Sequence, residues 1–272
     1  MHIGRNLPLD APGHDDIANV GFIVGKHCVA VIDSGGSPRT GRALRAALHD
    51  RTRLPVCYVI NTHVHVDHVL GDVAFRGDQP HFVGHARLAA ALARSRDFFL
   101  QNYAADFDAP ADAAQIIAPD LTVAPGQELH LDLGERELIL QAWPRAHTDC
   151  DLTVFDATTG TLWTGDLLFV GRTPALDGSL KGWLAVSAQL ARLTAKHVVP
   201  GHGPVSTDLA AALAPQQRYL QALLESVRAA IAAGKPLQDA GREVQPAHDG
   251  WQLWDATHPR NVARAYQELE WE

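Results

Sequence analysis

Short apolar runs, each bounded by turn residues, alternate with longer amphipathic segments in the first half of the chain. Residues 20–24 and 28–32 are two such runs that flank Gly25-Lys26-His27, and they predict a β-hairpin. The elements predicted after it are, in order, a helix over residues 38–50, a strand over 56–60, a strand over 81–83 and a helix over 86–94. Alternation of strands and helices is typical of a layered α/β fold.

Residues 95–120 interrupt this alternation because they show neither the period of a helix nor that of a strand. They hold Phe98, Phe99, Tyr103 and Phe107 among many acidic and small residues. We interpret the segment as an insertion that covers the functional site, with the four aromatic side chains as a substrate lid.

The second half repeats the order of strands followed by helices. Its predicted elements are strands over 137–142, 152–155, 162–164 and 197–199, and helices over 184–194, 209–233 with a break at Pro215, and 261–269. Two such halves predict a four-layer αββα sandwich, in which two mixed β-sheets pack together with helices on the outside. Neither a repeat nor a flexible linker marks a boundary, so residues 1–272 are expected to form one domain.

Composition narrows the range of partners. The 272 residues carry a formal net charge of −8 without a basic cluster, which argues against a nucleic-acid-binding or anionic membrane surface. No stretch approaches the roughly 20 apolar residues of a membrane span, and residues 1–16 lack the apolar core of a signal peptide. We therefore expect a soluble protein, cytoplasmic as the chain stands or periplasmic if a leader has been removed. The three cysteines are expected to be buried thiols.

One short motif concentrates metal-binding chemistry. His63-Val64-His65-Val66-Asp67-His68 follows the predicted strand 56–60 and places four potential ligands within six residues. In a loop after a strand, His63 and His65 are expected to face one centre while Asp67 and His68 turn toward a second. Imidazole and carboxylate are ligands that Zn²⁺ accepts, and the absence of thiolates argues against a closed structural zinc site.

Three further potential ligands follow the motif at long intervals. His147, Asp166 and His202 each follow or end an apolar run. Glycine precedes Asp166 and stands on both sides of His202, which permits close approach to another loop without a Cβ clash. Asp33, which precedes a glycine-rich turn, and Thr62 are expected to hydrogen-bond metal ligands from outside the site.

Together these residues resemble the metallo-β-lactamase superfamily, whose αββα sandwich binds one or two metals through H-x-H-x-D-H, a lone His, an Asp at a strand end and a final His. The resemblance extends from Ile32-Asp33-Ser34-Gly35 to Pro200-Gly201-His202-Gly203. It implies a first metal ion on His63, His65 and His147, a second on Asp67, His68 and His202, and Asp166 as a bridge between them. Aspartate at the bridging position makes the site similar to the glyoxalase II type.

Within the superfamily the chain looks closest to the SoxH-related zinc hydrolases called quinoprotein relay system metallohydrolases. The segments that carry this likeness are Asn61-Thr62-His63-Val64-His65, Gly165-Asp166-Leu167-Leu168-Phe169, Pro174-Ala175-Leu176-Asp177-Gly178-Ser179 and Glu268-Leu269-Glu270-Trp271-Glu272. The likeness implies a functional link to a quinoprotein dehydrogenase and says little about the substrate.

The resemblance also implies a hydrolase with two Zn²⁺ ions, although Fe or Mn fit the same ligands. The ions would share a water, lower its pKa toward 7 and supply hydroxide to attack a carbonyl, while Asp67 orients the water or passes a proton. Esters, thioesters, lactones and amides all fit this reaction. An apolar lid with few cations suggests a small substrate that is not heavily anionic.

Three other functions share part of this pattern. A β-CASP-type nuclease would need a further domain and a basic channel, and the sequence has neither. A persulfide dioxygenase would hold one Fe(II) on residues of the His63, His147 and Asp166 type, and ligand softness does not separate iron from zinc. The third is a non-catalytic metal- or quinone-binding partner of a quinoprotein system. Metal analysis and a substrate panel distinguish these functions.

Overall fold

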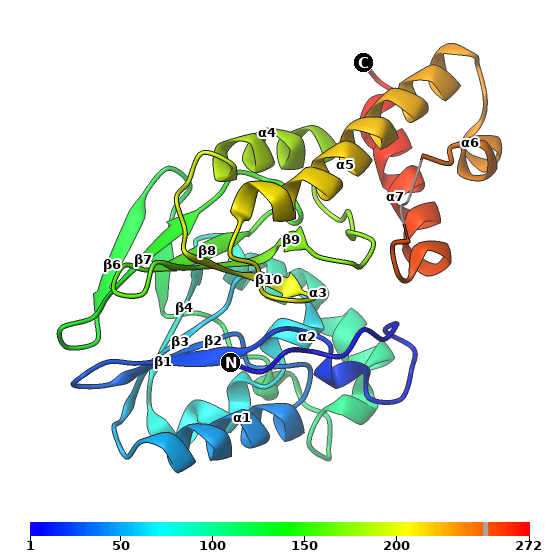
Figure 1. Ribbon diagram of the computed structural model, residues 1–272. Coiled ribbons are helices and arrows are strands. Elements are labelled where there is room, and N and C mark those ends of the chain that lie inside the picture. Colours follow the sequence, from blue (N-terminus) through cyan, green and yellow to red (C-terminus); the bar gives the residue numbers. More distant parts are fainter. Residues whose placement is uncertain (247–249) are drawn as a thin grey trace.

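The computed structural model describes residues 1–246 and 250–272. Two five-stranded β-sheets pack face to face, and helices cover the outer face of each (Figure 1). Helix α1 (Pro38–Arg51) lies outside the first sheet, and α4 (Leu180–Leu190) and α5 (Leu209–Ala232) lie outside the second. The predicted α/β sandwich of two mixed sheets with helices on the outside is therefore confirmed.

The first sheet has the strand order β1-β2-β3-β4-β5. Its strands are β1 (Gly21–Val24), β2 (Val29–Ile32), β3 (Val56–Ile60), β4 (His81–His85) and β5 (Leu121–Val123). β1 and β2 form the predicted antiparallel hairpin, and β2 to β5 run parallel. Because parallel strands end at the same edge of a sheet, the segments that follow β2 and β3 emerge side by side.

The second sheet has the strand order β10-β9-β8-β7-β6. Its strands are β6 (Glu128–Asp132), β7 (Glu137–Ala142), β8 (Leu152–Asp156), β9 (Thr161–Phe169) and β10 (His197–His202). β9 pairs in parallel with β10, and the other neighbours are antiparallel. β9 and β10 extend beyond the predicted 162–164 and 197–199, because their pairing continues through irregular register past the glycines that interrupt both apolar runs.

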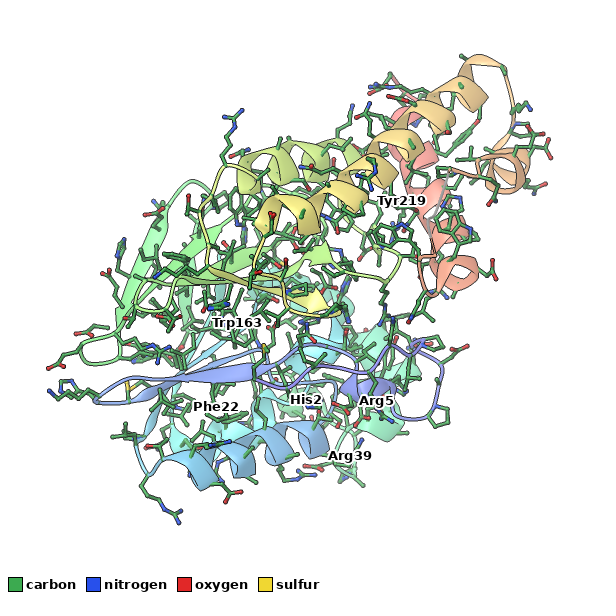
Figure 2. All side chains as sticks on the ribbon, viewed as in Figure 1. His2, Arg5, Phe22, Arg39, Trp163 and Tyr219 are labelled. Carbon is green, nitrogen blue, oxygen red and sulfur yellow. A yellow bond between two sulfur atoms is a disulfide. The ribbon has the colours of Figure 1, made fainter. Side chains whose placement is uncertain are left out.

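Apolar side chains from the facing surfaces of both sheets form the central core. They include Ile23, Ala30, Ile32, Ile60 and Val83 from the first sheet and Leu138, Leu140, Leu152, Val154 and Trp163 from the second. Trp163 lies between the two sheets in Figure 2. Further clusters join α1 to the first sheet and α4 and α5 to the second, so each sheet is packed on both faces.

Helices α2 (Val66–Val69) and α3 (Leu88–Asn102) flank the first sheet. α3 continues beyond the predicted end at residue 94, because Leu92 and Phe99 are buried on one helical face and extend the apolar stripe. Part of the predicted insertion over 95–120 is therefore helical. The 3₁₀ turns of the chain are His14–Asp16, Asp72–Asp78, Ala104–Asp106 and Ala113–Gln115.

The C-terminal helices depart from the predicted pattern in two ways. α5 is continuous through Pro215, and the predicted break is wrong because Leu213, Gln216 and Tyr219 are buried on both sides of it and hold the helix in place. α7 (Trp254–Leu269) begins before the predicted start at 261, and α6 (Leu237–Glu243) was not anticipated by the pattern. Tyr219 on α5 faces α7 (Figure 2), where its hydroxyl lies 3.0 Å from His258 Nδ1.

The cysteines differ from the expectation of three buried thiols. Cys28 and Cys57 form a disulfide, while Cys150 is a buried free thiol. The expectation is wrong for the first two because β2 pairs with β3 and brings the two Cα atoms to 5.8 Å. None of the helices in residues 1–246 and 250–272 has the length and apolar character needed to cross a membrane.

Candidate metal centre

The H-x-H-x-D-H motif leaves the first sheet directly after β3. His63 and His65 lie in the loop, and His65 is the residue at which α2 begins as its N-terminal cap. Asp67 and His68 lie in the short α2 and are both buried. Val66 packs into an apolar cluster with residues of α3, which fixes the turn that presents the polar side chains.

Three more polar side chains reach the motif from the second sheet. His147 lies between β7 and β8, Asp166 lies within β9, and His202 ends β10. Gly165 has a φ of +49°, and a Cβ at Gly201 would overlap Asp166 Oδ1. Glycine at these two positions therefore allows Asp166 to approach both its neighbouring strand and the motif.

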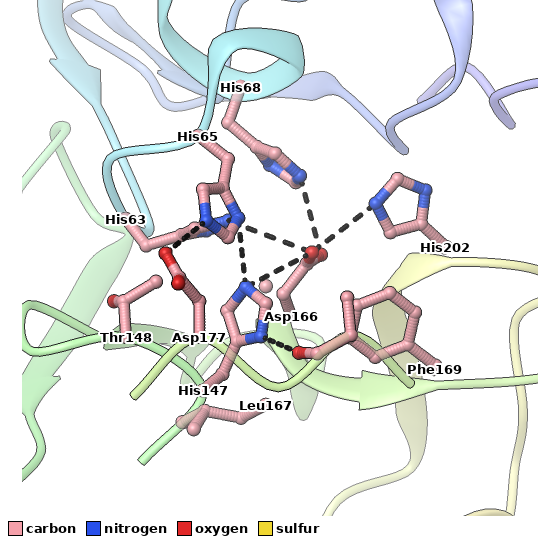
Figure 3. A network of polar contacts seen from close by, with 12 residues as sticks. His63, His65, His68, His147, Thr148, Asp166, Leu167, Phe169, Asp177 and His202 are labelled. Atoms are coloured by element: carbon pink, nitrogen blue, oxygen red, sulfur yellow. Dashed lines mark hydrogen bonds and ion pairs between the residues drawn. The ribbon is translucent and has the colours of Figure 1, made fainter. Parts of the chain in front are cut away.

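Six side chains gather in two groups around Asp166, and Figure 3 shows the histidines among them. We call His63, His65 and His147 the first group, and Asp67, His68 and His202 the second group. In the first group, His65 Nδ1 lies 3.1 Å from His63 Nε2 and 3.0 Å from His147 Nε2. Ligand atoms around a tetrahedral zinc ion are about 3.4 Å apart, so this spacing suits a metal ion.

Asp166 contacts both groups. Its Oδ2 lies 3.6 Å from His63 Nε2 and 3.4 Å from His147 Nε2 in the first group. In the second group, its Oδ1 lies 3.3 Å from His68 Nε2 and its Oδ2 lies 3.3 Å from His202 Nε2. One carboxylate is therefore within reach of two adjacent cation positions.

Buried hydrogen bonds hold the second group in place. Asp33 Oδ2 lies 2.8 Å from His68 Nδ1 and accepts a hydrogen bond from Thr62 Oγ1 at 2.8 Å, while its Oδ1 accepts one from the Thr62 backbone N–H. Asp33 has a φ of +51°, a left-handed conformation that aspartate adopts more readily than most residues. His202 Nδ1 lies 2.9 Å from the carbonyl oxygen of Ile17. The outward nitrogen of each ring is occupied, and Nε2 faces the site.

The carboxylates of the site favour their charged form. Burial acts to raise the pKa of Asp166, but the charges of His202 and His68 outweigh it and hold that pKa well below its ordinary value. Burial also opposes ionisation of Asp67, yet the charge of His68 and a hydrogen bond from His202 lower the pKa of Asp67. Both side chains are therefore available to a cation at neutral pH.

Four of the five histidines divide into two kinds. Burial lowers the pKa of His63 well below its ordinary value and that of His147 to about 4, so both rings are neutral and ready to bind a metal. Burial also opposes the charge of His68, but Asp166 and Asp67 raise its pKa well above the ordinary value, and Asp166 likewise raises the pKa of His202. A metal ion in the second group would displace the protons of these two rings.

Two atoms at the centre indicate what the site is built to hold. His68 Nε2 and Asp166 Oδ1 are buried 3.3 Å apart, and neither has a hydrogen-bond partner in the described part of the chain. Unpartnered buried polar atoms are costly, whereas a divalent cation between them would bind both. The donor set of nitrogen and carboxylate oxygen also suits such an ion.

Two functional neighbours escape sequence reasoning. Arg172 is buried beside the second group, with Nη1 3.5 Å from His202 Nδ1, and it forms no ion pair with any described acidic group. Asp177 Oδ2 lies 3.3 Å from His65 Nε2. Asp177 lies in one of the segments that carry the family resemblance, but nothing in its local spacing marks it as a contact of a ligand.

A cleft of about 580 Å³ lies beside the first group. Val64, Thr148 and Asp177 line it, and each is a sequence neighbour or a hydrogen-bond partner of a histidine in that group. Arg87, Arg94 and Arg145 line it as well. His65 contacts Asp177 in this lining, and 28% of its side chain is exposed.

The aromatic side chains predicted as a lid lie at two depths. Phe99 and Phe107 are buried in the apolar cluster that supports α2. Phe98 is 56% exposed, and Tyr103 is half-buried with its ring 5.9 Å from that of His14. Burial raises the pKa of Tyr103, and the negative charge of Asp67 adds to this shift.

Comparison with known proteins relates this geometry to a family. The family model of the metallo-beta-lactamase superfamily matches residues 14–202, which contain the side chains of both groups and Asp166. Helices α5, α6 and α7 lie beyond the matched residues. No curated protein matches the chain.

Several solved structures share the fold. A metallo-beta-lactamase from Pontibacter korlensis is 21% identical, with a TM-score of 0.59 over 74% of this chain and 85% of that one. A metallo-beta-lactamase family protein from Thermus thermophilus is 19% identical, with a TM-score of 0.69 over 99% and 90%. The sec-alkylsulfatase Pisa1 from Pseudomonas sp. is 17% identical, with a TM-score of 0.69. The alignment covers 93% of this chain and 47% of the alkylsulfatase. At these identities the likeness shows the fold.

Proposed function

The chain belongs to the metallo-beta-lactamase superfamily, and we propose that it is a zinc-dependent hydrolase with a dinuclear metal site that attacks a carbonyl of a small molecule. Members of this superfamily are mostly metal-dependent hydrolases. The observation that carries the proposal is the placement of Asp166 between two groups of potential ligands, within 3.6 Å of a nitrogen in each.

The residues that would hold the two ions follow from the groups. We assign the first ion to His63, His65 and His147, the second to Asp67, His68 and His202, and the bridging position to Asp166. This aspartate bridge is of the glyoxalase II type. Zinc is the metal we propose because imidazole nitrogen and carboxylate oxygen are ligands that it accepts, although iron and manganese accept the same ligands.

Asp67 is the residue to which we assign the proton transfer. Two zinc ions, when bound, lower the pKa of water toward 7 and supply a hydroxide nucleophile. Asp67 Oδ2 lies 3.3 Å from His202 Nε2 and 3.5 Å from His68 Nε2, so this oxygen belongs to the second group. Oδ1 of the same carboxylate remains to orient the attacking water and to accept its proton.

Esters, thioesters, lactones and amides all fit this reaction. Substrate would enter beside His65, the exposed member of the first group. Phe98 is exposed and Tyr103 packs half-buried against the apolar cluster, and these two side chains are the parts of segment 95–120 that we propose as a lid.

Elemental analysis of the purified protein, beside a panel of ester, lactone, thioester, cephalosporin and glutathione persulfide substrates, tests the proposal. We expect about two zinc ions per chain and hydrolysis of at least one carbonyl substrate. A chelator should abolish the hydrolysis, and added zinc should restore it. One iron per chain with oxidation of the persulfide would support a dioxygenase instead. Two bound metals without any turnover would support a metal-binding partner protein.

The finer family assignment is also a proposal. Asn61-Thr62-His63-Val64-His65 and Pro174-Ala175-Leu176-Asp177-Gly178-Ser179 support a place among the SoxH-related quinoprotein relay system metallohydrolases. A functional link to a quinoprotein dehydrogenase would follow. Co-purification of the two proteins from a host that expresses both tests the link, and their independent elution would argue against a stable complex.

The disulfide between Cys28 and Cys57 supports the periplasmic alternative for the compartment. We expect thiol titration in denaturant, without reductant, to find Cys150 as the reactive thiol of the chain. Reaction of all three cysteines in protein taken directly from cells would support a reducing compartment.

A further inference from the structure

Four of the five histidines in the site share one orientation. Their Nε2 atoms face the cluster, while Nδ1 makes an outward contact: Thr62 Oγ1 at 3.1 Å for His63, Asp33 at 2.8 Å for His68, the Ala175 carbonyl at 2.6 Å for His147 and the Ile17 carbonyl at 2.9 Å for His202. His65 is reversed. Its Nδ1 faces the other rings of the first group, and its Nε2 points away from the cluster toward Asp177 (Figure 3).

The outward contact of His65 also differs in its surroundings. Asp177 Oδ2 lies 3.3 Å from His65 Nε2, and Asp177 Oδ1 accepts a hydrogen bond from the Arg264 guanidinium at 2.6 Å. The side chains of Asp177 and Arg264 are 43% and 54% exposed. His65 is thus the ligand whose orientation depends on a solvent-exposed contact, because packing leaves its own ring partly uncovered.

Arg264 belongs to a helical face that holds the loop bearing Asp177. Asn261, Arg264 and Glu268 are three and four residues apart on α7, so they lie on one side of it. Asn261 Oδ1 accepts from the Leu176 N–H at 2.9 Å. The two carboxylate oxygens of Glu268 accept from Ser179 Oγ and the Leu180 N–H, at 2.7 and 2.6 Å. The loop from 174 to 180 is therefore fixed on both sides of Asp177 by one helix.

From these contacts we infer that Asp177 is a positioning residue for His65, and that Arg264 on α7 holds Asp177 in place. The inference rests on the proposed metal site. A neutral imidazole that binds a metal through Nδ1 must carry its proton on Nε2, and Asp177 accepts that proton in a hydrogen bond. Such contacts fix the ring and its tautomer, and their loss typically costs 10–100-fold in metal affinity. A helix beyond the family-matched residues thereby sets the geometry of the first ion.

Zinc titration in competition with a chromophoric chelator tests the inference. Asp177→Ala should weaken one of two zinc ions by roughly 10–100-fold and leave the other unchanged, and Arg264→Ala should have a smaller effect in the same direction. Arg228→Ala is the matched control, because it removes another exposed ion pair, to Glu272 at 2.8 Å, without touching Asp177. Unchanged affinity for both ions in Asp177→Ala would overturn the inference.

A charge swap separates positioning from simple tethering of the loop. Asp177→Arg combined with Arg264→Asp preserves an ion pair between loop and helix but removes the acceptor for His65 Nε2. We expect the swapped protein to keep the weakened zinc affinity of Asp177→Ala. Recovery of the parent affinity would mean that the pair only tethers the loop, which would overturn the inference. If Asp177→Ala fails to fold, Asp177→Leu, which is close to aspartate in size and also lacks the acceptor, replaces it.

A second readout does not require metal. In the metal-free parent protein at alkaline pH, the ¹⁵N chemical shifts of the His65 ring should report a proton on Nε2, and Asp177→Ala should shift the population toward Nδ1. A parent that binds no zinc but shows this tautomer would contradict the proposed function alone. A parent that binds two zinc ions and shows the same tautomer distribution in Asp177→Ala would contradict the positioning role alone.

Discussion

The two groups of the site differ in charge and in depth. The first group consists of three imidazoles, and His65 within it is 28% exposed. The second group includes the carboxylate of Asp67, and none of its side chains exceeds 7% exposure. Arg172 lies beside the second group, while the cleft opens beside the first.

This difference indicates a division of labour within one site. Under the proposed function, a cation in the first group would have imidazole ligands and would lie near the solvent, where a substrate would arrive. A cation in the second group would be enclosed with the carboxylate of Asp67, which we expect to accept a proton. Asp166 links the two, so the division holds only while that carboxylate is present.

Removal of the Asp166 carboxylate should have the largest effect on metal content and activity, because this carboxylate links the two groups. We expect Asp166→Ala to lower the zinc content of both groups and to abolish hydrolysis. Native mass spectrometry and elemental analysis measure the metal, and a thermal melt verifies that the protein is folded. Retention of one zinc ion at the parent affinity would show that the groups bind independently.

Asp67→Asn should affect metal binding in the two groups differently. Asparagine keeps the shape of the side chain but loses its charge and basicity, so the first ion should remain and the second should weaken. Two functions are lost at once, and kcat should fall by more than the roughly 10²–10⁴-fold typical of a single acid–base residue. Near-normal turnover at full zinc occupancy would contradict the role of Asp67 in proton transfer.

Substitution of the aromatic side chains tests whether the substrate reaches the site only beside the first group. Phe99→Ala should destabilise the fold by about 3–5 kcal/mol, because the ring is buried in the cluster beneath α2. Phe98→Ala and Tyr103→Ala should instead raise KM or change the substrate range with zinc content unchanged. Denaturant unfolding and steady-state kinetics measure the two effects. Loss of metal in Phe98→Ala would argue against the lid.

Asp72 lies beneath the second group and provides a test of stability only. Its Oδ1 accepts hydrogen bonds from Ser34 Oγ and Asn61 Nδ2, and Ser34 also donates to the His68 carbonyl. Burial raises the pKa of Asp72 to about 7. The folded state therefore prefers the neutral acid, so the stability that it contributes is complete below the ordinary carboxyl pKa and is lost as the pH rises to about 7.

Asp72→Asn should remove this pH dependence. The free energy of unfolding of the variant should gain on that of the parent between about pH 4 and pH 7, by at most about 1.4 kcal/mol per pH unit. Urea titrations across this range measure the difference. Parallel curves for the two proteins would show that Asp72 is charged in the folded state.

The sequence best predicts the elements and motifs whose residues are adjacent along the chain. Strands β3 and β7 match the predicted 56–60 and 137–142, because the apolar run of β3 ends at Asn61 and Pro144 follows closely after β7. β5 and β6 escape prediction since β5 has three residues and β6, at the edge of its sheet, has only Leu131 buried among its five positions. An edge strand buries one face at most and leaves a weak pattern.

The site follows the same rule. The motif 63–68 carries its chemistry in adjacent positions, and the glycines around Asp166 and His202 mark the later side chains. Arg264 and Arg172 leave no comparable signal, because a charged residue on a helix or in a loop is normally solvated. Their contacts arise only when α7 folds against the loop that bears Asp177 and the segment after β9 lies beside His202, over sequence distances that local patterns do not encode.

The cleft beside His65 affects how fast a charged molecule would reach the site. Arg94 is paired with Asp149 at 2.6 Å, whereas Arg87 and Arg145 pair with no acidic side chain among the residues that the structure describes. In a chain with a net charge of −8, this is a local attraction for anions within a repulsive field. An ester with a carboxylate should therefore associate faster at low ionic strength, and its kcat/KM should fall with added salt while that of a neutral ester stays constant. Such a result would replace the expectation of a substrate that is not heavily anionic.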